Sequence, residues 1–163
     1  MLIKLIGAAA LVGGCFAAGK RGADKLAYRV QMLMGLEEAL LIFEGELLYK
    51  LSDIRDAFSA ASVCDISGIF KKSADNTEKL GAVKAFRAGV MSAELEKDET
   101  VALNAFASGL LSPDVEGQVK NAALCRERIK AILKIAKEKK ERCSKLYTAS
   151  CFFAGAAMVI LLL

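Results

Sequence analysis

The sequence predicts an all-α, membrane-anchored helical bundle, with two long membrane-proximal helices and about four short helices between them. Only one of the 163 residues is proline, while Ala, Leu and Lys are abundant, which favours helices over sheets. The 55% hydrophobic fraction excludes disorder. Apolar residues gather at the two ends, with 14 in residues 1–18 and 15 in residues 146–163, whereas the stretch between them has an ordinary 47%.

The two ends predict membrane segments. Residues 146–163 carry no charge and would span about 27 Å as a helix, which predicts a C-terminal transmembrane helix. Residues 1–19 predict an N-terminal transmembrane or signal-like segment. Three alternatives stay open for it: an uncleaved membrane helix, a cleaved signal peptide, or lipidation at Cys15. Residues 20–145 are then the central helical domain.

The distribution of charge predicts the orientation. Residues 1–36 carry a net charge of +4, residues 37–119 carry −7, and residues 120–163 carry +7. Because both basic blocks lie just inside the apolar ends, the positive-inside rule places the central domain on the cytoplasmic side. The basic blocks lack interleaved aromatic residues, so the pattern favours a membrane surface over nucleic acid.

Apolar periodicity predicts a first helix from Lys20 to Leu51. Its seam is typical of a coiled coil and would bury against another helix. The seam consists of Leu33, Leu36, Leu40, Phe43, Leu47 and Leu51. Ser52 and Asp53 should end this helix, and they offer a cap for the next one, at about 53–62.

Shorter elements should follow. A brief amphipathic turn carries Ile66, Ile69 and Phe70, and ends near residue 73. A helix capped by Asn76 or Thr77 should then run to about residue 95, and another should begin at Asp98. The expected inward side chains of these two helices are Leu80, Val83, Phe86, Val101, Leu103, Phe106 and Leu110.

The run Ser112-Pro113-Asp114 predicts the start of the last helix. A serine cap, proline at the first helical position and an acid in the first turn all favour initiation there. Since no later residue would stop this helix, it should continue into the C-terminal membrane segment.

The sequence offers few of the residue types and patterns that carry out catalysis or bind metals. The chain has no histidine, which removes imidazole catalysis and imidazole metal sites. Its five cysteines form no C-x-x-C pair and predict reduced, mostly buried thiols. The acids of residues 37–56 are read as a solvated face and not as a cation site. We therefore expect no enzyme activity, no catalytic or metal site and no cofactor.

Glu44 and Gln118 lie within apolar periodicity. Two interpretations are equally supported. The two side chains form hydrogen bonds between the long helices and fix their register, or they are rim residues of the bundle.

Two stretches together resemble a known family. They are Leu36-Glu37-Glu38-Ala39-Leu40 through Glu44, Glu46 and Tyr49, and Leu103 through Phe106 and Leu110 to Gln118. With the basic final helix and short terminal anchor, they resemble stage III sporulation protein AB, a family related to the F-type inner-membrane platform proteins of type II secretion and type IV pilus machines. After Tyr49 this chain has Lys50-Leu51-Ser52-Asp53 in place of the Thr-Pro that is common there.

The resemblance implies a non-enzymatic platform in the mother-cell membrane, within the channel complex that links mother cell and forespore during endospore formation. It implies a family-like structural motif of Leu36, Leu40, Glu44, Glu46, Tyr49, Leu110 and Gln118. The implied partners are the other proteins of that complex, including its ATPase, together with the lipid bilayer and a possible second copy of the chain. No nucleic acid or small-molecule substrate is expected. The alternative is a secreted or lipid-anchored helical protein-binding module.

Overall fold

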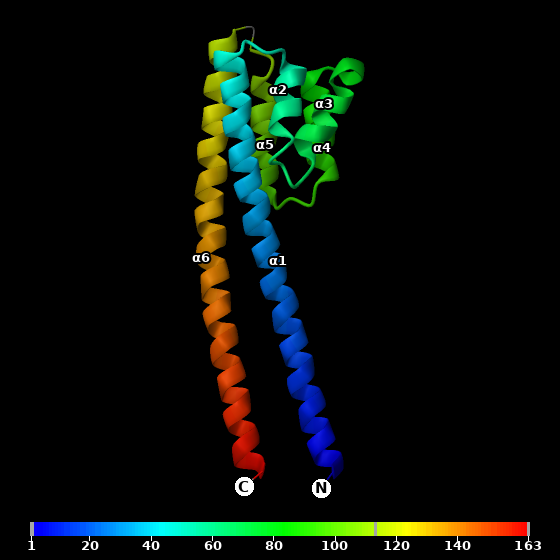
Figure 1. The fold of residues 1–163 in the computed structure, drawn as a ribbon, viewed down its shortest axis with the longest axis vertical. Coiled ribbons are helices and arrows are strands. Elements are labelled where there is room, and N and C mark those ends of the chain that lie inside the picture. Colours follow the sequence, from blue (N-terminus) through cyan, green and yellow to red (C-terminus); the bar gives the residue numbers. More distant parts are fainter. Residues whose placement is uncertain (1, 113, 163) are drawn as a thin grey trace. The chain divides into compact units, whose positions relative to one another are not determined.

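The computed structural model is all-helical over the residues it describes, with backbone described for 2–112 and 114–162 and side chains for 20–112, 114–143 and 146. The six helices are α1 (Leu2–Tyr49), α2 (Ile54–Ala61), α3 (Ile69–Leu80), α4 (Ala82–Ser92), α5 (Lys97–Gly109) and α6 (Val115–Leu162). Along the chain, four short helices therefore lie between two long ones, as the sequence predicts (Figure 1).

The chain divides into two compact units. Unit 1 holds residues 1–30 and 135–163, which are the first part of α1 and the last part of α6. Unit 2 holds residues 31–134, including all four short helices. In the predicted membrane segments 1–19 and 146–163, the backbone is helical over residues 2–19 and 146–162. The side chains of these segments lie outside the described residues, apart from that of Leu146.

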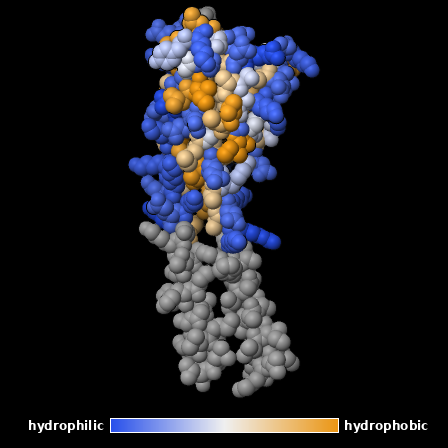
Figure 2. Space-filling model, viewed as in Figure 1, coloured by the Kyte–Doolittle hydropathy of each residue, from blue (hydrophilic) through white to orange (hydrophobic). Residues whose placement is uncertain are grey.

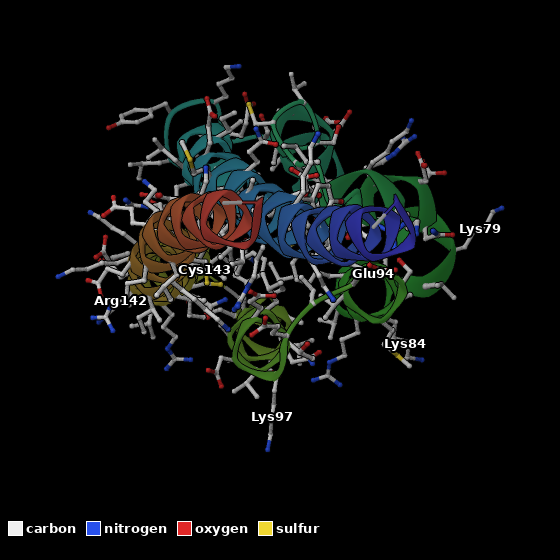
Figure 3. The ribbon with its side chains drawn as sticks, turned by 90° about the horizontal axis from the view of Figure 1, so that it is seen from below. Lys79, Lys84, Glu94, Lys97, Arg142 and Cys143 are labelled. Atoms are coloured by element: carbon white, nitrogen blue, oxygen red, sulfur yellow. The ribbon has the colours of Figure 1, made fainter. Side chains whose placement is uncertain are left out.

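One phenylalanine from each of the first five helices enters the core of unit 2. The five rings are fully buried and belong to Phe43, Phe58, Phe70, Phe86 and Phe106. Stacked pairs, such as Phe43 with Phe58 at 5.3 Å, alternate with edge-to-face pairs, such as Phe86 with Phe106 at 4.9 Å. Such ring pairs add to the stabilisation that comes from apolar burial. Charged side chains of the short helices, Lys79, Lys84 and Lys97 among them, point outward (Figure 3).

The seam predicted for the first long helix is buried as far as Leu47. Leu51 is the exception, because α1 ends at Tyr49 and the Leu51 side chain is 77% exposed. The predicted cap of α2 is confirmed, since Asp53 Oδ1 accepts a 2.8 Å hydrogen bond from the Ile54 N–H. This bond satisfies a donor that the first turn of a helix leaves without an intrahelical partner.

The prediction that Asn76 or Thr77 begins a helix is wrong. Both lie inside α3, where Asn76 Nδ2 donates to Lys72 O and Thr77 Oγ1 donates to Ser73 O. Their polar side chains bond back to the preceding turn and do not cap a new one. The break falls instead at Gly81, whose φ of 77° suits glycine, so Leu80 ends α3 half exposed.

The starts of α5 and α6 also differ from the prediction. Helix α5 begins at Lys97, and Glu96 and Glu99 form a reciprocal capping box there. Val101, expected inside, is exposed, whereas Leu103, Phe106 and Leu110 are buried as predicted. At α6, Asp114 replaces Ser112 as the cap.

Two hydrogen bonds identify Asp114 as that cap. Its carboxylate accepts from the Gly117 N–H at 2.7 Å, and its carbonyl accepts from the Gln118 N–H. Ser112 Oγ donates to the same carboxylate at 2.8 Å. An aspartate cap with a serine beside it thus starts the helix at Val115.

Candidate functional site: the junction of the two long helices

The family-like motif residues lie in α1, at the end of α5 and in α6, all within unit 2. Leu36, Leu40 and Leu110 are buried core residues. Glu44, Glu46 and Gln118 are partly buried and hydrogen-bonded, and Tyr49 is 83% exposed. The motif therefore consists of three leucines of the core, three polar residues that form hydrogen bonds and one exposed aromatic ring.

Glu44 joins the two long helices. Its Oε1 accepts a 2.8 Å hydrogen bond from Arg126 Nε of α6, and both side chains are mostly buried. The hydrogen bond to Glu44 raises the pKa of the Arg126 guanidinium. Of the two interpretations of Glu44, the cross-helix bond is the one confirmed. A charge-assisted bond in such a setting holds the register of two neighbouring helices.

Gln118 has a different task from the one proposed with Glu44. Its Nε2 donates to the Ser112 carbonyl at 2.9 Å, so it bonds within the connection between α5 and α6. One contact from α6 to α5 is made instead by Asn121, whose Nδ2 donates to the Phe106 carbonyl at 2.8 Å. Asn121 was not predicted, because a single amide in an amphipathic helix carries no signal of its partner 15 residues away.

Glu46 closes the end of α1. Its carboxylate accepts from Lys50 Nζ at 2.6 Å and from Ser52 Oγ at 3.0 Å. The hydrogen bond from Lys50 is the main reason that the pKa of Glu46 lies below its usual value. These two bonds hold the Lys50–Asp53 turn, the stretch in which the sequence departs from the family pattern.

Two of the described thiols, those of Cys64 and Cys125, are held in their protonated form. Cys125 is buried against α5, where its Sγ lies 3.7 Å from the Ala102 carbonyl, and burial raises its pKa to about 12. Partial burial and the neighbouring Glu38 raise the pKa of Cys64. Since the thiolate is the reactive form, both cysteines are poor nucleophiles at neutral pH.

Neither a metal site nor a membrane span is found within the part of the chain that the structure describes. No group of three or more Cys, Asp or Glu side chains there converges as metal ligands would. Over those same residues, no helix has both the length and the hydropathy needed to cross a bilayer.

Taken together, these residues define a helical protein whose described side chains are organised for packing and for bonds between helices. The family model of stage III sporulation protein AB matches residues 4–163, which is essentially the whole chain. The chain belongs to this family, and its role is related to sporulation. Comparison with curated proteins and with solved structures gives no match.

Proposed function

We propose that this chain is a non-enzymatic scaffold of the channel complex that links mother cell and forespore. It would hold the other proteins of that complex in position, including the ATPase. The family membership over residues 4–163 supports this role most directly. A chain without histidine, with two unreactive thiols and a core of packed rings, also suits a protein that binds other proteins.

The proposed location is the mother-cell membrane that faces the forespore. Both ends of the chain would be embedded there, and residues 20–145 would lie in the cytoplasm. The apolar ends and the basic blocks just inside them support this arrangement. In the alternative, lipidation at Cys15 or secretion would place the same helical domain outside the cell.

Co-purification from sporulating cells tests the scaffold role. The full chain, solubilised in mild detergent, should carry the ATPase and the channel proteins of its complex in reproducible ratios. A variant with Glu44→Gln and Arg126→Gln, which removes the bond between the long helices, should weaken that association. Recovery of the chain as a monomer without these proteins would contradict the proposal.

Thiol labelling tests the orientation. Cys64 is a poor reporter because its thiol is partly buried beside Glu38, so Val63→Cys on the same loop, at an 84% exposed position, is the better one. An impermeant reagent should label this variant in permeabilised cells and leave it unlabelled in intact spheroplasts. Met91→Cys, 86% exposed on α4, is the matched second site. Labelling of both in intact spheroplasts would place the domain outside.

The intact mass of the mature chain separates the lipid-anchored alternative. An unprocessed N-terminus supports the membrane platform. A chain that begins at Cys15 with added acyl mass would replace it with the exported binding module.

A further inference from the structure

Five apolar side chains are exposed at the end of unit 2 where α1 ends and α6 begins. This end patch consists of Leu48, Tyr49, Leu51, Leu111 and Val115. Tyr49, Leu51 and Leu111 are the most exposed of them, at 83%, 77% and 74%. Figure 1 shows that the end of α1 and the start of α6 lie at the same end of this unit, and Figure 2 shows apolar side chains there beside hydrophilic ones. Exposed apolar side chains that gather on one part of a surface are typical of interaction sites.

The backbone at Leu51 is strained. Its φ of 51° is the only positive value of a non-glycine residue in the described chain. Glycine is the usual residue in this conformation, because the Cβ atom of other residues lies too close to the following carbonyl oxygen, and asparagine is tolerated because its short side chain can form a local hydrogen bond. The side chain gains little from burial in return. The left-handed conformation itself ends α1, where the Ser52 N–H donates to the Glu46 carbonyl, but glycine would form this turn without strain. Because neither burial nor the turn explains a leucine at this position, its presence points to a function of that residue.

The surroundings of the end patch are acidic. Residues 46–56 and 111–116 carry five acids and two bases, a net charge of −3. Both bases are already engaged, because Lys50 pairs with Glu46 and Arg55 pairs with Glu78, each at 2.6 Å. Hydrogen bonds from Ser112 and Gly117 hold the pKa of Asp114 below its usual value, so this carboxylate stays ionised.

This charge selects among the possible occupants. An anionic bilayer surface would be repelled, and two copies of the patch facing each other would bring like charges together. A basic protein surface is complementary to it and would approach faster and bind more specifically.

We propose that the end patch docks into a shallow apolar pocket, rimmed by Lys and Arg side chains, on another protein of the channel complex. This inference rests on the proposed scaffold role and adds to it the contact surface and the chemistry of the partner. Tyr49 and Leu51 would enter the pocket as anchors, and the acidic rim would pair with the basic one.

Site-specific photo-cross-linking in sporulating cells tests the docking. The photoreactive residue replaces Leu51 or Leu111 in the full chain, and Met91 in a matched control that is equally exposed on α4. Both patch positions should give a product with the same protein, through peptides that contain Lys or Arg beside apolar residues. Met91 should give none. Products with lipid, with a second copy of the chain or with an acidic peptide would overturn the docking, as would the same product from Met91.

The purified chain provides the second measurement. Leu51→Gly should raise the midpoint of thermal unfolding, because it relieves the strain, and should lower the cross-linking yield from Leu111 at least tenfold. Leu51→Ala keeps the strained φ, so it should lower the yield without raising the midpoint. An unchanged yield for Leu51→Gly would overturn the proposal. If that yield is unchanged while the wild-type chain still co-purifies with its complex, only the proposed docking surface is wrong. If the wild-type chain co-purifies with none of these proteins, the scaffold role itself is wrong.

Discussion

At the scale of single residues, the polar groups inside unit 2 are held by short directional bonds. Asp65, nearly buried before α3, accepts from the Ser67 N–H at 2.9 Å and from the Phe70 N–H at 2.8 Å. Ser73 Oγ, fully buried, donates to the Ile69 carbonyl at 2.6 Å. Buried polar groups need such partners, because an unpaired one would cost about 1–3 kcal/mol. These bonds add specificity to an otherwise apolar core.

The bond between Glu44 and Arg126 should be worth more than a surface pair. A double-mutant cycle with Glu44→Gln and Arg126→Gln should give a coupling energy of about 1 kcal/mol in urea unfolding, because both side chains are mostly buried. The exposed pair Arg55–Glu78 is the control and should give about 0.3 kcal/mol. Equal coupling in the two cycles would show that burial adds nothing to the first.

Cys125 should make the fold sensitive to alkali. Its folded pKa of about 12 lies above the unfolded value of about 9, so only the unfolded chain ionises between these two pH values. The associated stability is complete below pH 9 and should fall by roughly 1 kcal/mol per pH unit above it.

The matched variant Cys125→Ser isolates this effect from the titration of other groups. It keeps a donor for the Ala102 carbonyl but does not ionise in this range. The difference in unfolding free energy between the two chains should therefore shrink from pH 9 to pH 11. A constant difference over this range would show that the thiol ionises equally easily in both states.

At the scale of helices, the sequence predicts well what local residues decide. The number and order of the elements, the cap at Asp53 and the buried seam from Leu33 to Leu47 follow from periodicity and capping chemistry. The helix start predicted at Asn76 or Thr77 was wrong, because side chains of these types can either cap a helix or form hydrogen bonds to the preceding turn within one. Gly81 was the better signal, since its positive φ ends α3.

Two glycines of α1, ten residues apart, should respond to alanine with opposite signs. A Cβ at Gly35 would lie 2.4 Å from the Cys64 carbonyl oxygen, whereas a Cβ at Gly45 would have no neighbour within 4 Å. Gly35→Ala should therefore destabilise unit 2 by about 2 kcal/mol, because α1 must move away from the loop before α3.

Gly45→Ala is the control for helix propensity. It should stabilise the chain by roughly 0.5–1 kcal/mol, since alanine loses less backbone freedom in a helix than glycine does. Urea unfolding of both variants measures the two effects. If Gly35→Ala also stabilised the chain, the close approach of Gly35 to the Cys64 carbonyl would be contradicted.

At the scale of the whole molecule, the five-ring core could be predicted only in part. Periodicity identified four inward phenylalanines, Phe43, Phe70, Phe86 and Phe106, but not Phe58. That the rings meet depends on how helices distant in sequence pack, which no local pattern encodes. The partner of Glu44 could not be predicted for the same reason. Arg126 lies 82 residues away along the chain, in a stretch where the sequence shows only that basic residues are frequent.

Truncation of one ring should affect all of unit 2. Phe86 contacts Phe58, Phe70 and Phe106, with ring centroids 4.9–5.7 Å apart. Phe86→Ala should cost about 4 kcal/mol of unfolding free energy, which includes the cavity left behind. Met91→Ala, on the exposed side of the same helix, should change it by less than about 0.5 kcal/mol. A loss below about 1 kcal/mol for Phe86→Ala would mean that the core closes without this ring.

The placement of one ring on each of five consecutive helices also affects how unit 2 opens. A short helix that detaches on its own must pull its ring away from rings on at least two other helices, so the opening of one helix also exposes the rings that stay behind on its neighbours. Protected amide protons in α2, α3, α4 and α5 should therefore exchange with solvent deuterium at one shared free energy, as a single cooperative block. A unit built in this way is either wholly assembled or wholly open, with few half-formed states for proteases to attack.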